Sequence, residues 1–147
     1  MTEIGFYHLT RTGLDAALPM LLGRTLQAGE KAVVSCADER LLAKLDDALW
    51  QCQKPDWLPH GTAHSSHPEW QPIYLTTGHE NPAGAHFLFR IDGSETAPDG
   101  FTRIFDLFDG NNEENVQSAR QRWRNAKAAG LSLTYWKQDV NGWVKAG

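Results

Sequence analysis

The chain has 147 residues, of which 41% are hydrophobic and 22% are charged, and its 14 basic and 18 acidic residues give a formal net charge of −4. This length predicts a single domain over residues 1–147, with a core that needs neither a metal nor a disulfide. The negative charge argues against general nucleic-acid binding, which relies on phosphate neutralisation, and no apolar run approaches the roughly 20 residues that span a bilayer.

The first third of the chain predicts alternating strands and helices. Residues 4–9 have the pattern of a strand, and leucines at helical spacing predict a helix from about residue 15 to 28. The short β-branched run within 31–36 indicates a buried strand, and Asp38 is placed to cap a second helix. This order favours an α/β fold, with a mostly parallel central sheet flanked by helices. The first residues lack the basic and apolar regions of a signal peptide, so we expect a cytoplasmic protein.

The rest of the chain continues this pattern after a break. Residues 51–72 hold four prolines and three histidines without periodicity, which predicts an ordered surface loop. We expect a last helix that Asn111 caps, with Glu114 as its capping-box partner, and that Gly130 ends. Residues 137–147 form a possible C-terminal extension whose role the sequence leaves open. The remaining expected strands are 73–77, 85–91, 102–108 and 131–136.

Signatures of nucleotide and metal sites are absent from the sequence. Neither GxxxxGK[ST] nor GxGxxG occurs, so the predicted Rossmann-like topology lacks its phosphate-binding glycines and we expect no cofactor. His60, His64 and His67 fall within eight residues, bracketed by Pro59 and Pro68. No cysteine or paired carboxylate completes a metal shell there, so we interpret them as exposed loop histidines and expect no metal.

The two cysteines offer a weak catalytic hypothesis. Cys36 and Cys52 form no CxxC pair, and we expect both to be reduced and partly buried. Cys36 ends a predicted central strand, where a small buried side chain is the usual role. A thiol just before a helix can also be activated as a nucleophile. A small α/β hydrolase or transferase that uses Cys36 or a loop histidine is therefore the alternative function.

The predicted last helix carries an apolar stripe and, beside it, a basic stripe. Residues 113–127 hold four basic and two acidic side chains, a local balance of +2 that includes Arg122. Compensation of the helix macrodipole explains the order of these charges. A pocket for an aromatic group with an attached carboxylate would explain both stripes, since arginine suits carboxylates. The apolar stripe comprises Val116, Ala119, Trp123 and Ala126, and the basic stripe comprises Arg120, Arg124 and Lys127.

A second aromatic patch lies near the loop. Trp50 ends the second predicted helix, and Trp57 follows shortly before Pro59 and His60. Six tryptophans in a chain of this length favour a protein that contacts partners, because tryptophan is enriched at interfaces. From the residues alone, this patch fits a partner surface as well as it fits a core.

Together these segments resemble the chi subunit family of bacterial DNA polymerase III over nearly the whole chain. The resemblance rests on their order and spacing. It is carried by Phe6-Tyr7-His8-Leu9, the stretch from Leu45 to Trp50, Trp57-Leu58-Pro59-His60, and Ala119 to Arg124 with Ala129-Gly130 after it.

The resemblance implies a non-catalytic adaptor in DNA replication, which contacts DNA only indirectly and no membrane. Such a protein links the clamp-loader complex to single-stranded-DNA-binding protein (SSB) by binding the acidic C-terminal tail of SSB, which ends in a phenylalanine carboxylate. A second surface binds the psi subunit where that subunit exists, or a helicase in some relatives. The implied tail-binding residues are Phe108, Arg120, Trp123, Arg124 and Lys127, and the implied psi or helicase surface comprises Trp50, Trp57, Pro59 and His60.

Two positions depart from the family pattern. Val116 stands where the family has a basic residue, which should weaken the electrostatic hold on the tail. Trp123 stands where the family often has tyrosine.

Overall fold

The computed structural model describes residues 3–51, 59–62, 67, 70–78, 81–91, 100–139 and 142–145, with only the backbone at positions 139 and 142. In these ranges strands and helices alternate along the chain up to a C-terminal hairpin. The elements are β1 (Glu3–Leu9), α1 (Leu14–Gln27), β2 (Ala32–Ser35), α2 (Glu39–Gln51), β3 (Ile73–Thr76), β4 (Phe87–Ile91), β5 (Arg103–Asp109), α3 (Glu113–Ala128), β6 (Ser132–Asp139) and β7 (Gly142–Lys145).

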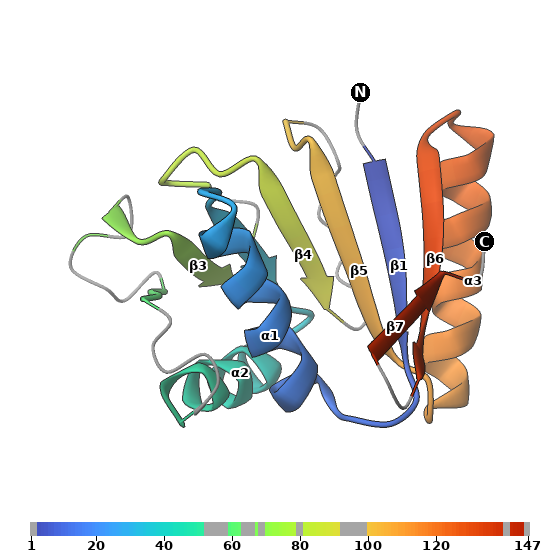
Figure 1. Ribbon diagram of the computed structural model, residues 1–147, viewed down its shortest axis with the longest axis horizontal. Coiled ribbons are helices and arrows are strands. Elements are labelled where there is room, and N and C mark those ends of the chain that lie inside the picture. The colour runs from blue at the N-terminus through green and yellow to red at the C-terminus, as the bar shows by residue number, and fades with distance from the viewer. Residues whose placement is uncertain are drawn as a thin grey trace.

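The strands form one sheet in the order β3-β2-β4-β5-β1-β6-β7 (Figure 1). All neighbours are parallel except β6 and β7. The strand β1 lies between β5 and β6, and its Phe6 is in register with Asp106 on one side and Tyr135 on the other. The predicted fold class, α/β with a mostly parallel sheet flanked by helices, is confirmed.

The sheet buries two apolar faces under different helices. Successive side chains of a strand point to opposite faces. Tyr7 accordingly packs with buried leucines of α1 and α2. Its neighbour Phe6 packs with Ala119 and Ala126 of α3. Figure 1 shows α3 running beside β6, apart from the α1–α2 pair. Any site on α3 is therefore separated from α1 and α2 by the sheet.

The helix ends follow local capping chemistry, with one correction to the sequence prediction. Asp38 Oδ1 accepts a hydrogen bond from the Leu41 backbone N–H at 2.8 Å, as predicted for an N-cap. The cap of α3 is Asn112, whose side chain accepts from the Asn115 N–H, so the predicted cap Asn111 is wrong. Asn111 donates its own N–H to Asp109 Oδ1 and belongs to the preceding turn. No helix in the described ranges has both the length and the apolar character needed to cross a membrane.

The C-terminal segment forms a hairpin that the sequence analysis did not predict. The strand β6 continues to Asp139, and β7 pairs with it in antiparallel register, with Trp143 opposite Gln138. The Gln138 Oε1 atom accepts three backbone N–H groups from Thr10, Arg11 and Thr12. This side chain therefore holds the end of β6 against the β1–α1 turn. Asn141-Gly142 is the dipeptide that could have indicated the hairpin.

Candidate functional site

Helix α3 is anchored to the sheet by a buried ion pair. Arg122 donates from Nε and Nη2 to the two carboxylate oxygens of Asp106, at 2.7 and 2.8 Å. Asp106 lies on β5 with no exposed surface, and Arg90 of β4 also contacts it at 3.1 Å. Arg122 donates further to Ser118. The sequence analysis counted Arg122 in the local charge balance of +2 but not in the basic stripe, and Asp106 engages this charge in the structure. Its role is to position α3.

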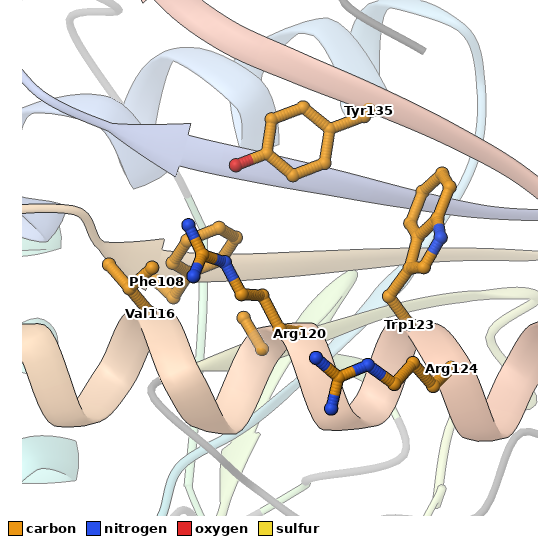
Figure 2. Close-up of a pocket in the computed structure, with 7 residues that line it drawn as sticks. Phe108, Val116, Arg120, Trp123, Arg124 and Tyr135 are labelled. Atoms are coloured by element: carbon orange, nitrogen blue, oxygen red, sulfur yellow. The ribbon is translucent and has the colours of Figure 1, made fainter.

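The apolar stripe of α3 borders a pocket between the helix and the sheet. Ala119 and Ala126 are buried, and Val116 and Trp123 are half-buried, because this side of the helix packs on β1, β5 and β6. A pocket of about 190 Å³, here called the α3 pocket, opens along the stripe. Its lining comprises Phe108, Val116, Ala119, Arg120, Trp123, Arg124 and Tyr135 (Figure 2).

Aromatic rings form the apolar wall of the α3 pocket. Trp123 packs edge-on against Phe6, with ring centroids 5.3 Å apart, and against Tyr135 at 5.9 Å. Phe108 lies 6.4 Å from Tyr135. Pairs at these separations have the edge-to-face and tilted geometry that aromatic quadrupoles favour. The wall is therefore well packed, and it offers ring surface to an inserted aromatic group.

Two arginines form the polar side of the α3 pocket. Arg120 and Arg124 are exposed, and Figure 2 shows both extending from the helix opposite the Tyr135 ring. Neither forms an ion pair with any carboxylate of the described residues, and Arg124 makes one long hydrogen bond, 3.4 Å, to Gln121. Lys127 is exposed on α3 outside the pocket lining. The structure thus brings together Phe108, Arg120, Trp123 and Arg124, with Lys127 nearby along the helix.

His8 and Tyr135 complete the wall, and the sequence analysis did not include either in the site. His8 Nδ1 shares a hydrogen bond with the Tyr135 hydroxyl, and the His8 ring lies 5.0 Å from that of Phe108. Burial, and then the charge of Lys137, lower the pKa of His8, so the imidazole is neutral at neutral pH. Burial raises the pKa of Tyr135 against the opposing charge of Arg120. Gly110 makes this packing possible, because a Cβ there would collide with the His8 ring.

The sequence contains a partial signal for these two residues. His8 and Tyr135 lie 127 positions apart, so no local pattern links them. Side chains alternate between the two faces along a strand. Tyr7, next to His8, and Trp136, next to Tyr135, point to the face covered by α1, so His8 and Tyr135 point to the α3 face. A register prediction for β1 and β6 would therefore have placed both residues on the α3 side.

The second predicted surface is described in part. Trp50 is 64% exposed at the end of α2, and its ring lies 4.6 Å from that of His60. His60 is buried, and its Nε2 lies 2.9 Å from Asp46 Oδ1. Pro59 is half-buried, and Trp57 lies outside the described residues. The structure thus brings Trp50 and His60 together, with an exposed indole tilted at 54° against a buried imidazole.

Among the loop histidines His60 differs from the sequence expectation, whereas Cys36 is buried, as expected. His60 was expected to be exposed and is buried, because it packs beneath Trp50; His67 is exposed, and His64 lies outside the described residues. The described residues contain no cluster of three side chains suited to a metal. Burial, together with Asp38 and Glu39, raises the pKa of Cys36 to about 12, so this thiol is protonated and unsuited to nucleophilic attack. Cys52 lies outside the described residues.

Comparisons with known proteins identify relatives of the chain. Residues 1–134 match the family model described as DNA polymerase III chi subunit, HolC. The probable DNA polymerase III subunit chi of Rickettsia prowazekii is 27% identical over 97 residues, which cover 66% of this chain and 59% of that relative. The DNA polymerase III subunit chi of Haemophilus influenzae is 25% identical over 112 residues, which cover 74% of this chain and 76% of that relative. The chain thus spans less than two thirds of the Rickettsia relative. Trp136 and Trp143 lie beyond the residues that match the family model.

Proposed function

Because the chain belongs to the DNA polymerase III chi subunit family, which gives it a role in DNA replication, we propose that it is a non-catalytic adaptor. In this role it links the clamp-loader complex of the polymerase to SSB, by binding the acidic C-terminal tail of SSB in the α3 pocket. Contact with DNA is then indirect, through SSB.

The observation that carries this proposal is the composition of the α3 pocket. One side consists of aromatic rings, and the other carries two exposed guanidinium groups that no described carboxylate pairs with. A tail that ends in phenylalanine presents an aromatic ring and a carboxylate within a few ångströms of each other. The ring enters beside Phe108 and Trp123, and the carboxylate pairs with Arg120 or Arg124 through the two-pronged geometry that arginine offers.

The size of these interactions favours a weak complex. Burial of one phenylalanine side chain contributes roughly 1.5–3 kcal/mol, and one charge-assisted hydrogen bond contributes about 1.5–3 kcal/mol. Their sum falls well below the roughly 12 kcal/mol of a nanomolar complex, so the affinity is micromolar or weaker. Lys127 adds long-range attraction for acidic residues upstream in the tail. Several tails on one SSB assembly would raise the effective affinity without any new contact.

The surface around Trp50 is proposed to bind a second protein, the psi subunit where it exists or a helicase. An exposed indole held against a buried imidazole resembles the aromatic anchors that dominate protein interfaces. Trp57 and Pro59 belong to the same proposed surface. Occupation of this surface and of the α3 pocket at the same time would make the chain a bridge.

A peptide-binding measurement tests the proposal. Fluorescence anisotropy of a labelled peptide that copies the SSB C-terminus compares the free acid with the C-terminal amide. We expect micromolar binding of the acid, weaker binding of the amide, and loss of affinity as salt increases. Equal binding of the two peptides, or binding that is independent of salt, would contradict the proposal.

A further inference from the structure

A second pocket lies on the opposite face of the sheet from α3. Figure 1 shows α1 in front of the sheet near β3 and β4, and β7 crossing in front of the strands on the other side of the sheet. Between them lies a pocket of about 310 Å³, here called the hairpin pocket. Its aromatic lining comprises Tyr7, Phe87, Phe105, Trp136 and Trp143. Two of these rings, those of Trp136 and Trp143, come from the part of the chain beyond residue 134.

In the hairpin pocket two buried rings form the base, and two tryptophan rings pack against one of them. Tyr7 and Phe105 are buried, and their ring centroids lie 5.6 Å apart. Trp143 stands almost perpendicular to Tyr7 at 5.0 Å, and Trp136 lies parallel to it at 6.1 Å. Trp136 donates its Nε1–H to Thr134, which fixes the indole. Both tryptophans are half-buried, so ring surface faces the pocket and solvent.

Two arginines border the hairpin pocket. Arg24 of α1 and Arg103 of β5 are both exposed lining residues. The Arg103 guanidinium lies 4.8 Å from the ring centroid of Phe105 and 5.5 Å from that of Phe87, in cation–π geometry. Within the described part of the chain, neither arginine forms an ion pair, and no carboxylate lines the pocket. Glu3 is close enough to influence Tyr7 but lies outside the lining.

We propose that the hairpin pocket is a second docking site, for a short acidic peptide segment of a partner protein that inserts one aromatic side chain. The aromatic rings accept the inserted side chain, and Arg24 and Arg103 pair with flanking carboxylates. A strand of nucleic acid fits less well. Nucleic acid needs an extended basic groove with stacking platforms. This site is a concave pocket with two cations in a chain of net charge −4. The proposal does not depend on the function proposed for the α3 pocket.

Fluorine NMR of the full chain tests this proposal, because the two pockets contain different tryptophans. The protein is labelled with 5-fluorotryptophan, and the signals of Trp123, Trp136 and Trp143 are assigned with single Trp→Phe variants. The probe is acetyl-Asp-Glu-Phe-Glu-Asp-amide, whose blocked C-terminus removes the carboxylate that the α3 pocket is proposed to bind. We expect saturable shifts of the Trp136 and Trp143 signals, and no shift of Trp123.

Matched variants and ligands make the result decisive. The double variant Arg24→Ala, Arg103→Ala should weaken binding by about tenfold or more. Arg40→Ala, Lys44→Ala removes the same charge from exposed positions on α2 and should bind as wild type. Arg24→Ala alone repeats the test if loss of Arg103 disturbs folding, because Arg24 makes no cation–π contact with a ring of the described residues. Four results would overturn the proposal: no shift, equal shifts with alanine in place of the peptide phenylalanine, equal losses in both double variants, or tighter binding of a ten-nucleotide oligothymidylate.

Discussion

The Arg122 guanidinium and the Asp106 carboxylate form two hydrogen bonds, at 2.7 and 2.8 Å, across the interface between α3 and β5. Because Asp106 is completely buried, this contact fixes the position of α3 along the sheet and its rotation about its own axis. Because Arg120 and Arg124 each lie two positions from Arg122, they point away from the buried pair. The same contact thus anchors the helix and exposes the two arginines that line the α3 pocket.

Arg122→Ala should destabilise the protein strongly. The substitution leaves the Asp106 carboxylate buried with Arg90 as its remaining described cation, and removing one partner of a buried ion pair costs roughly 3 kcal/mol. Urea unfolding measures the loss. Arg124→Ala is the matched control, because it is exposed on the same helix, and it should change stability by less than about 0.5 kcal/mol. Equal effects of the two substitutions would show that the Asp106 pair does not hold α3.

His8 should titrate below its ordinary pKa of 6.5, because burial and the nearby charges of Lys137 and Arg120 disfavour the imidazolium. The unfolded chain then binds the proton more readily than the folded chain. The His8 contribution to stability is therefore complete above pH 6.5 and is lost as the pH falls from 6.5 through the folded-state pKa. NMR titration of the ring measures that pKa, and a midpoint at or above 6.5 would refute the expectation. His8→Gln should unfold with less dependence on pH than wild type over the same window.

Cys36 should be inert in the folded protein. Its pKa of about 12 and its burial leave almost no accessible thiolate at pH 8. In a Cys52→Ser background, a colourimetric thiol reagent should react with Cys36 only after denaturant is added. Rapid labelling of the native protein would instead revive the hypothesis of a cysteine-dependent enzyme.

Trp50→Ala should weaken binding at one of the two proposed surfaces and leave the other unchanged. The indole is 64% exposed and its one ring contact among the described residues is with His60, so we expect a stability loss of about 1 kcal/mol or less. Calorimetry with the SSB-tail peptide should give the wild-type affinity, because Trp50 lies outside the α3 pocket. Binding of a partner at the Trp50 surface should weaken by tenfold or more, as is typical of an aromatic hot spot worth about 2 kcal/mol. An unchanged affinity for that partner would remove Trp50 from the interface.

The sequence predicted the elements well where local chemistry decides them. Strand β2 is a short apolar run, Asp38 caps α2, and Gly130 adopts the positive φ that ends α3, so each could be identified from its neighbours. The position of the α3 cap was wrong by one residue, because Asp109 holds Asn111 in the preceding turn. The order of the strands depends on pairing between distant segments, which the sequence does not display.

The candidate site could be predicted only in part, for a related reason. The helical spacing of Trp123 with Arg120 and Arg124 is visible in the sequence, and the structure gathers these residues in one pocket. The engagement of Arg122 was missed because Asp106 lies 16 residues away on another element. The hairpin pocket was missed altogether, since it joins Tyr7, Phe105 and Trp143 from three separate strands.

The most direct test of the account asks whether the tail carboxylate and a specific arginine of the α3 pocket recognise each other. Calorimetry measures the SSB-tail peptide, as free acid and as amide, with wild type, Arg120→Ala and Arg124→Ala, which forms two double-mutant cycles. For wild type we expect the amide to bind about tenfold or more weakly than the acid. For the variant that lacks the carboxylate-binding arginine, acid and amide should bind equally. If the amide is weaker by the same factor in both variants as in wild type, neither arginine binds the carboxylate, and the proposed mode of tail binding is contradicted.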